Sequence, residues 1–146
     1  MSHQPSIDVI VVTFNHKRFM QSLFEGFLKT DYPKDRWKIH IVDNLSTDGS
    51  REEIRSLIER HRDQLPEIHF IEPDTNLGFA GGNNFIMRES HADYVYLLNP
   101  DAAFEERSLS EIVRVAEDRK DVGAFQSLQV LMQDPTKIGS IGNDIV

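Results

Sequence analysis

The sequence predicts an α/β domain with a mostly parallel, Rossmann-like sheet and helices on both faces. Three observations indicate this class. Short runs of apolar, β-branched residues alternate along the chain with segments whose apolar residues recur at helical spacing. The first run, residues 7–13, is apolar at nearly every position, as in a strand covered on both faces. Polar residues directly follow several of these runs, at the strand ends where open α/β sheets bind ligands.

The first half of the chain alternates strand and helix twice. After the first strand, a helix is expected over the periodic apolar residues of 19–28, and the Tyr-Pro pair at 32–33 ends it. A second strand is expected at 39–43. A second helix begins at about Ser50, which stands in capping-box spacing with Glu53.

The second half continues the alternation. A helix at 79–89 is entered through a glycine-rich loop, and Ser108 and Glu111 form a second capping box that introduces another helix. Three further apolar runs predict strands, at 69–72, 94–98 and 122–126. After Ser127 the pattern weakens, and no clear element is expected.

Composition limits the function classes. A chain of 146 residues is expected to form one domain, and its formal charge of −8 disfavours binding to a nucleic acid polymer. No apolar run reaches the roughly 18 residues of a membrane helix. The chain contains no cysteine, which excludes disulfides and thiol catalysis within it and fits a reducing compartment. We therefore expect a soluble, cytoplasmic protein.

The segment YVYLLNPDA, residues 94–102, carries the strongest functional signal. Its apolar strand runs into Asn99, Pro100 and Asp101, which supply an oxygen ligand, a rigid turn and a carboxylate. Such a set is suited to holding a divalent cation over a diphosphate. An acidic protein needs a cation or directed backbone amides to hold an anionic ligand, so we expect Mg²⁺ or Mn²⁺ at Asp101.

The second strand is followed directly by Asp43 and Asn44 in the segment VDNLSTDGS. A carboxylate at such a junction can accept hydrogen bonds from a nucleobase or a ribose. The alternative is a strand-end turn in which Asp48 and Gly49 make the bend. The first strand ends in Thr13, Phe14 and Asn15, where Phe14 either stacks on a base or belongs to the core.

The glycine-rich loop precedes a helix, and its residues Gly78, Gly81 and Gly82 have two interpretations. Bare backbone amides at a helix N-terminus attract phosphate, whereas glycine also permits close packing of a helix on a sheet. Asn83 and Asn84 either bind a ligand or cap the helix. The loop is not a dinucleotide fingerprint, because TFNHKRF, with no glycine, follows the first strand. The six histidines show no metal-binding spacing and no GxSxG elbow is present.

Together, the segments VVTFN, VDNLSTDGS, NLGFAGGNN and LLNPDA resemble the family 2 glycosyltransferases, which have the GT-A fold, and especially their rhamnosyltransferase-like branch. The resemblance covers about residues 5–130 and implies that the chain is the N-terminal, donor-binding half. In that family Thr13 and Asn15 would line the nucleotide pocket, and Asp43 would contact the base. Gly81 and Asn84 would lie beside the ribose or diphosphate. The candidate donor-binding residues are Thr13, Phe14, Asn15, Asp43, Asn44, Ser46, Asn76, Gly81, Asn84, Asn99 and Asp101.

Two features depart from the family pattern. Asn99 replaces the usual first aspartate of the DxD motif, so Asp101 must carry the ionic part of metal binding. Family members also continue beyond this length to build an acceptor half with the catalytic base, which we expect to be missing after about residue 130 of the single domain 1–146. No base can be assigned, since Glu105 and Glu106 are explained equally well as residues at a helix entry.

The resemblance implies transfer of a sugar, with inversion, from a dTDP- or UDP-sugar to a glycan or lipid-linked acceptor in cell-surface polysaccharide synthesis. Mg²⁺ or Mn²⁺ would serve as cofactor, and peripheral association of a full-length protein with the inner face of the membrane stays open. One alternative is a non-catalytic nucleotide-sugar-binding module. Another is a nucleotidyltransferase, although that class usually has a glycine- and arginine-rich loop where this chain has TFNHKRF.

Overall fold

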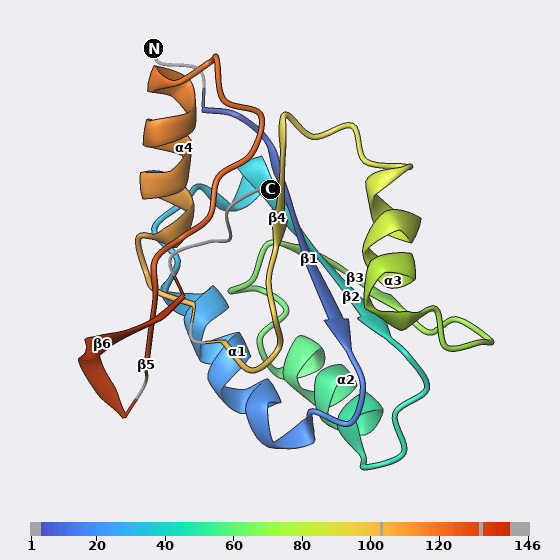
Figure 1. Cartoon of the computed structure of the whole chain (residues 1–146). Coiled ribbons are helices and arrows are strands. Elements are labelled where there is room, and N and C mark those ends of the chain that lie inside the picture. The colour runs from blue at the N-terminus through green and yellow to red at the C-terminus, as the bar shows by residue number, and fades with distance from the viewer. Residues whose placement is uncertain (1–3, 103, 132, 141–146) are drawn as a thin grey trace.

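A computed structural model describes residues 4–102, 104–131 and 133–140 of the chain. At its centre lies a four-stranded, wholly parallel sheet with the strand order β3-β2-β1-β4 (Figure 1). The strands are β1 (Ile7–Thr13), β2 (Trp37–Asp43), β3 (Glu67–Ile71) and β4 (Tyr94–Leu97). The predicted strands at 7–13, 39–43, 69–72 and 94–98 are therefore confirmed, within a residue or two at their ends.

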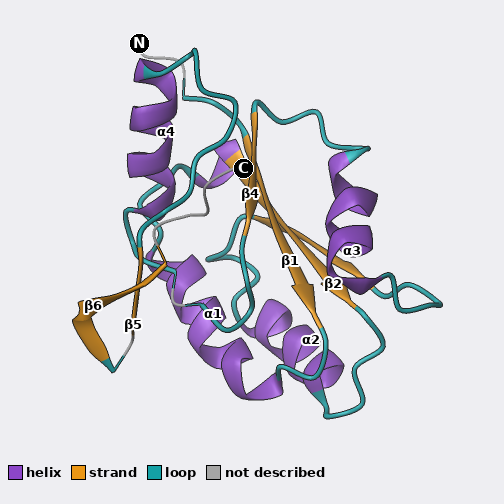
Figure 2. Ribbon diagram, viewed as in Figure 1, coloured by secondary structure: helices purple, strands orange, loops and turns teal. Residues whose placement is uncertain are grey.

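Helices cover both faces of the sheet, as the sequence predicts (Figure 2). The helices are α1 (Lys17–Lys29), the 3-10 turn η1 (Lys34–Arg36), α2 (Ser50–Arg60), α3 (Gly78–Met87) and α4 (Ser108–Asp118). The apolar faces of α1, α2 and α4 share one core with the sheet, while α3 packs on the opposite face. Within the part of the chain that the structure describes, none of the helices is long and apolar enough to cross a bilayer.

The position of β1 inside the sheet, with helices on both faces, explains why its sequence is almost continuously apolar. Its side chains alternate between the two cores: Val9 and Val11 face α1 and α2, whereas Ile10 and Val12 face α3. Every residue of the strand is buried. Burial of such a side chain stabilises the fold by about 1.5–3 kcal/mol, so this strand fixes the position of everything that leaves its carboxyl end.

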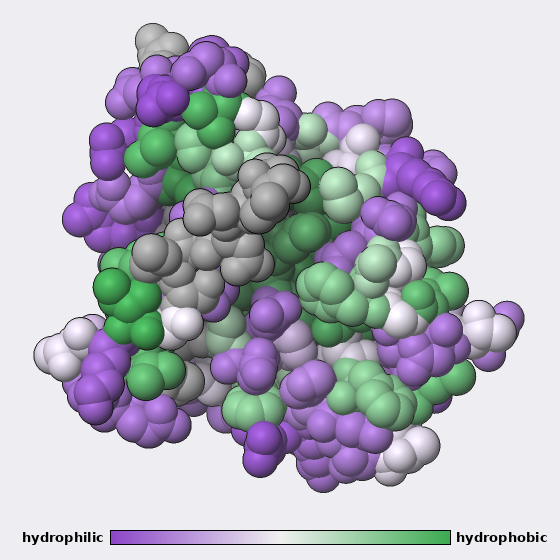
Figure 3. Space-filling model, in the orientation of Figure 1, coloured by the Kyte–Doolittle hydropathy of each residue, from purple (hydrophilic) through white to green (hydrophobic). Residues whose placement is uncertain are grey.

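The C-terminal part of the chain differs from the expectation. Residues 122–126 form no strand. Instead β5 (Gln129–Leu131) and β6 (Asp134–Ser140) form a separate antiparallel pair with irregular register. A three-residue strand and one that contains proline and glycine lie below the length and pattern that periodicity detects. Apolar side chains are exposed on this hairpin, and green residues gather over it in Figure 3.

Both predicted capping boxes are wrong. The N-cap positions of α2 and α4 are occupied by Gly49 and Arg107, and neither helix has a side-chain cap bond from that residue. Ser50 and Ser108 are already the first helical residues. In the case of α2 the physical reason is the backbone of Gly49, whose φ of 88° brings the chain into the helix one residue earlier than the spacing of Ser50 and Glu53 suggests.

Candidate functional site

The carboxyl ends of β2, β1 and β4 lie side by side along one edge of the sheet. Thr13 is in register with Asp43, so β1 and β2 end at the same level. The N–H of Leu98 donates to the carbonyl of Ile10 at 2.9 Å, which brings the chain out of β4 beside β1. Two strand spacings of about 4.8 Å separate β2 from β4. Asp43 and the Asn99–Pro100–Asp101 turn therefore belong to one edge.

The loops after β1 and β2 are locked together by reciprocal hydrogen bonds. The N–H of Asn15 donates to Ser46 Oγ, and the N–H of Thr47 donates to Asn15 Oδ1, both at 2.8 Å. The N–H of Asn44 donates to the carbonyl of Thr13, also at 2.8 Å. The structure thus brings Thr13, Asn15 and Ser46 together, and their polar groups form the frame of the candidate site.

Two non-glycine residues in these loops have left-handed backbones. The φ angles are 57° for Asn15 and 68° for Leu45. Asparagine adopts this conformation readily, but for leucine it costs about 1–2 kcal/mol. The N–H of Leu45 donates to the carbonyl of Asp43 at 2.9 Å, which holds the strained turn in place. Strain of this kind concentrates at ligand sites because the surrounding structure must enforce it.

The carboxylate of Asp43 is the centre of this frame. The residue is fully buried, and its Oδ1 accepts hydrogen bonds from the N–H of Ser46 at 2.9 Å and from Arg51 Nε at 2.8 Å. Its Oδ2 has no hydrogen-bond partner among residues 4–102, 104–131 and 133–140. A buried acceptor without a partner costs about 1–3 kcal/mol, so a further hydrogen-bond donor at this oxygen would be stabilising.

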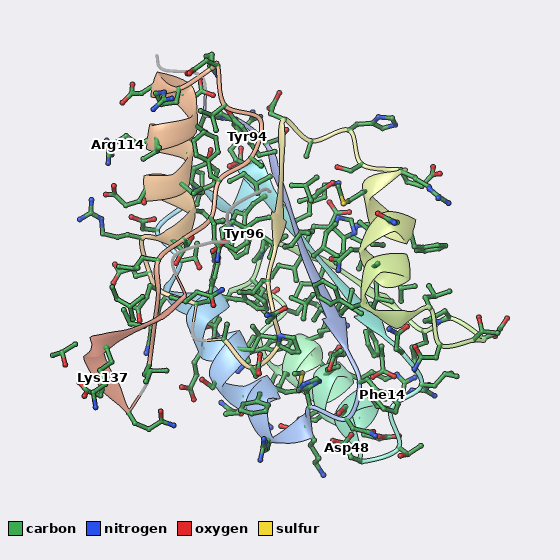
Figure 4. All side chains as sticks on the ribbon, in the orientation of Figure 1. Phe14, Asp48, Tyr94, Tyr96, Arg114 and Lys137 are labelled. Carbon is green, nitrogen blue, oxygen red and sulfur yellow. The ribbon has the colours of Figure 1, made fainter. Side chains whose placement is uncertain are left out.

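Asp48 links the beginnings of α1 and α2. One carboxylate oxygen accepts the N–H of Lys17, and the other accepts the N–H of Ser50, both at 3.0 Å. Desolvation alone would raise the pKa of Asp48, but the hydrogen bonds from the Ser50 hydroxyl and from the backbone of Lys17 and Ser50 lower it below its usual value. The sequence treats Asp48 only as part of a bend, whereas the structure makes it a shared helix cap. Figure 4 shows Asp48 and Phe14 at the same end of the molecule.

The side chains of Asn44 and Asn76 hold the glycine-rich loop. Asn44 Nδ2 donates to the carbonyl of Gly78, and Asn44 Oδ1 accepts the N–H of Leu77, both at 3.1 Å. Asn76 Oδ1 accepts the N–H of Gly78 at 2.8 Å. Both predicted donor-binding amides are therefore engaged in fixing the start of α3 against the end of β2.

Of the glycines of α3, Gly82 serves close packing on the sheet, which is the second of the two interpretations, whereas a Cβ at Gly78 would meet no atom within 4 Å. A Cβ added at Gly82 would lie 2.9 Å from both methyl carbons of Val12 on β1. At Gly81 the nearest contact would be Leu77 Cβ, at 3.3 Å. Asn83 is buried and donates to the carbonyl of Phe79 at 2.9 Å, whereas the side chain of Asn84 is exposed. Only Asn84 of this pair faces solvent, where a ligand has access.

Asn99 and Asp101 are exposed on either side of the buried Pro100. Within the described ranges their side chains make no hydrogen bond or ion pair, and no group of three or more histidine or acidic side chains is placed to hold a metal. A carboxylate and an amide oxygen are nevertheless suitable ligands for Mg²⁺ or Mn²⁺. Mg²⁺ commonly uses one or two carboxylates, with phosphates and water as its remaining ligands, so these residues fit the expected cation.

Phe14 is not a core residue: 47% of it is exposed, beside the buried Thr13. Its N–H donates to His16 Nδ1 at 3.2 Å, which fixes the loop while the ring stays accessible. Glu105 and Glu106 are exposed in the turn before α4, and nothing in their surroundings distinguishes either as a base.

Sequence reasoning missed Arg51, which lies on α2 beside Asp43. No local pattern distinguishes this arginine from other charged residues of a helix surface. The hydrogen bond to Asp43, together with the charges of Asp43 and Glu72, raises the pKa of Arg51 above its ordinary value. Glu72, directly after β3, lies 3.6 Å from Arg51 Nε.

Two cavities lie away from this edge. One, of about 520 Å³, opens between the C-terminal part of α3 and the first halves of β1 and β2, where the paired Asp8 and His40 are found. The other, of about 670 Å³, runs along β4 toward α4 and residues 122–127. Neither is lined by Asp43 or Asp101. The candidate site is therefore identified by chemistry and not by cavity volume. Its marks are the Asp43 oxygen that lacks a partner among the described residues and the exposed side chains of Asn99 and Asp101.

Comparisons with known proteins identify the family of the chain. The model of the family described as Glycosyl transferase family 2 matches residues 8–139. TuaG of Bacillus subtilis, a glycosyltransferase assigned to teichuronic acid biosynthesis, is 23% identical over 135 residues, covering 92% of this chain and 51% of that protein. The poly(ribitol-phosphate) β-N-acetylglucosaminyltransferase TarS of Staphylococcus aureus is 25% identical over 104 residues, covering 70% of this chain and 17% of TarS.

Solved structures show the same fold. The mannosyltransferase PcManGT of Pyrobaculum calidifontis, in complex with GDP-Man and Mn²⁺, superposes with a TM-score of 0.72 at 26% identity, covering 79% of this chain and 33% of that one. Residues 1–349 of TarS in complex with UDP-GlcNAc superpose with a TM-score of 0.69 at 20% identity, covering 88% of this chain and 38% of that one. The chain thus spans about half the length of TuaG and a smaller share of the others.

Proposed function

The chain belongs to glycosyltransferase family 2, and we propose that it is the donor-binding half of an enzyme that transfers a sugar from a nucleoside diphosphate in cell-surface polysaccharide synthesis. One observation carries the proposal. Among the residues that the structure describes, the buried Asp43 has an oxygen without a partner, at the same sheet edge at which the exposed side chains of Asn99 and Asp101 make no hydrogen bond or ion pair. A base-reading acceptor and a cation-binding carboxylate, two strands apart, suit the two ends of a nucleoside diphosphate.

In this proposal Asp43 binds the nucleobase. An ionised carboxylate only accepts hydrogen bonds, and its Oδ1 is already occupied by Ser46 and Arg51. The free Oδ2 therefore suits a base with one ring N–H. Uracil and thymine each present one such group, whereas guanine presents a ring N–H beside an amino group. We infer a UDP- or dTDP-sugar, with the exposed Phe14 as a stacking surface.

In this proposal the diphosphate lies between Asp101 and the start of α3. Asp101 and Asn99 would hold Mg²⁺ or Mn²⁺, which acts on a leaving diphosphate as a Lewis acid when bound. The loop around Gly78 has a positive φ of 67° and directs the chain into the N-terminus of α3, whose positive dipole end favours anions, while the N–H groups of Leu77 and Gly78 themselves donate to Asn44 and Asn76. Asn84, exposed on the same helix, is available to the ribose or the diphosphate.

The acceptor site and the catalytic base are proposed to lie outside the chain, in the part of the relatives that it does not match. Direct attack by an acceptor hydroxyl on the anomeric carbon inverts its configuration, and a carboxylate on the far face of the sugar would take the hydroxyl proton. We propose a glycan or lipid-linked acceptor. We also propose that the protein acts in the cytoplasm, at the inner face of the membrane.

Thermal unfolding with and without ligand tests the proposal. UDP or dTDP with Mn²⁺ at 100 times its Kd should stabilise the native state by about 2.7 kcal/mol, which corresponds to a rise of about 8 °C in Tm. Asp101→Ala should remove the metal-dependent part of the rise. Asp63→Ala, an exposed aspartate after α2, should leave it unchanged. A folded protein whose Tm does not respond to any nucleoside diphosphate would contradict the proposal.

A further inference from the structure

Arg51 reaches from the first turn of α2 to the end of β2. Its Nε donates to Asp43 Oδ1 at 2.8 Å, and the arginine side chain is 28% exposed whereas that of Asp43 is completely buried. Arg51 therefore touches both the solvent and the carboxylate of Asp43, which water does not reach. An isolated buried carboxylate would be strongly disfavoured, and Arg51 supplies the opposite charge that it requires.

The contact between the two residues uses one carboxylate oxygen only. Arginine and carboxylate often pair through two parallel hydrogen bonds, which would engage both oxygens. Here Oδ1 receives both Arg51 Nε and the N–H of Ser46, and Oδ2 receives neither. An arginine that served stability alone would be expected to satisfy Oδ2 as well. The observed geometry places the guanidinium and the Ser46 N–H at Oδ1 and leaves Oδ2 for a ligand.

A second acidic residue, Glu72, also lies beside Arg51. Glu72 Oε1 lies 3.6 Å from Arg51 Nε, and Glu72 Oε2 accepts Arg55 at 2.5 Å. The guanidinium of Arg55 lies 5.7 Å from the ring centre of Phe70 on β3. Charges of alternating sign thus run from Asp43 through Arg51 and Glu72 to Arg55, between the end of the sheet and one face of α2.

We propose that Arg51 is a positioning residue for donor recognition, which holds the Asp43 carboxylate so that Oδ2 accepts the ring N–H of the nucleobase. This inference rests on the proposed function. It gives the basis of selectivity: a charged Asp43 accepts from uracil N3–H but is repelled by cytosine, whose N3 is an acceptor. UDP and CDP have the same diphosphate and ribose, so the pair isolates the contribution of this contact.

Loss of the arginine has a specific consequence. Without Arg51, Asp43 Oδ1 keeps only the hydrogen bond from the Ser46 N–H, so the carboxylate can turn and Oδ2 is no longer fixed toward the ring N–H. The preference for uracil over cytosine should therefore fall, because it depends on that one oxygen.

The experiment is a calorimetric titration of the full chain with UDP and with CDP, in Mn²⁺. The wild type should prefer UDP. Arg51→Gln should bind UDP about 10- to 100-fold more weakly, the strength of a hydrogen bond to a charged group, and should lose most of its preference for UDP over CDP. Arg51→Lys, which keeps the charge, should keep the preference.

Several outcomes separate this inference from its alternatives. Arg60→Gln, in the exposed last turn of the same helix, serves as the matched control and should behave as wild type. Equal weakening of UDP and CDP by Arg51→Gln, or an unchanged ratio between them, would overturn the positioning role. If Arg51→Gln does not fold, a lysine variant that folds but has lost the preference would equally overturn that role. A wild type that binds neither nucleotide refutes the proposed function itself.

Discussion

The contact between Gly82 and Val12 gives the most quantitative test of how α3 is placed. A Cβ at Gly82 would lie 2.9 Å from both Val12 methyl carbons, whereas non-bonded carbons prefer about 3.5–4.0 Å. Val12 cannot turn aside easily, because its branched side chain is stiff and buried between the sheet and the helix. Gly82→Ala therefore requires α3 to move away from the sheet.

The expected magnitude combines two opposing effects. Overpacking of a core costs about 1–3 kcal/mol, while replacing glycine by alanine inside a helix gains about 1 kcal/mol. Gly82→Ala should thus lower the free energy of unfolding by about 1 kcal/mol, or Tm by about 3 °C. Gly81→Ala is the matched control, since its new Cβ would lie 3.3 Å from one Leu77 atom and the helical gain should prevail.

Urea denaturation of the two variants, with Val12→Ala alone and combined with Gly82→Ala, measures this effect. In the Val12→Ala background, Gly82→Ala should no longer meet the clash and should show only the helical gain of about 1 kcal/mol, which gives a coupling energy of about 2 kcal/mol. If Gly82→Ala is as stable as Gly81→Ala, the packing explanation is wrong. If instead it keeps its stability but loses nucleotide binding, glycine is needed for close approach of phosphate.

Two further predictions concern the loops after β1 and β2. Asp48→Ala should lower the free energy of unfolding by about 1–2 kcal/mol at pH 7, because it removes caps from two helices. Since the pKa of Asp48 is lowered in the folded state, its stabilisation is present above the unfolded value of about 3.9 and is lost as the pH falls through the folded pKa. The difference between the variant and wild type should therefore shrink in acid, and a difference that grows below pH 4 would contradict this. Leu45→Asn should raise the free energy of unfolding by up to about 1 kcal/mol, because asparagine tolerates the φ of 68°. Chemical denaturation measures it, and a loss of stability would show that packing of the leucine outweighs the strain.

The sequence predicts most of the framework because its strands are strongly patterned. Residues 7–13 could form little else than a strand covered on both faces, and the polar residues after it had to lie at the carboxyl edge. The two capping boxes failed because Ser50 and Ser108 have the right spacing but are the first residues inside their helices rather than the caps before them. That distinction depends on backbone angles, which spacing does not contain.

The residues of the candidate site were easier to predict from the sequence than the contacts among them. Asp43 and Asp101 are marked by their places after apolar runs. The hydrogen bonds of Asn44 and Asn76 depend on where the glycine-rich loop packs. The hydrogen bond of Arg51 to Asp43 forms only because α2 packs beside β2. The β5–β6 hairpin was missed because a three-residue strand carries too little periodicity.

A crystal structure of the chain with UDP and Mn²⁺ tests the central claim most directly. We predict uracil N3 at hydrogen-bond distance, about 2.7–3.2 Å, from Asp43 Oδ2, with the cation on Asp101 and the diphosphate beside the start of α3. A nucleotide bound in the cavity near Asp8 and His40, with Asp43 Oδ2 still unpartnered, would contradict the account.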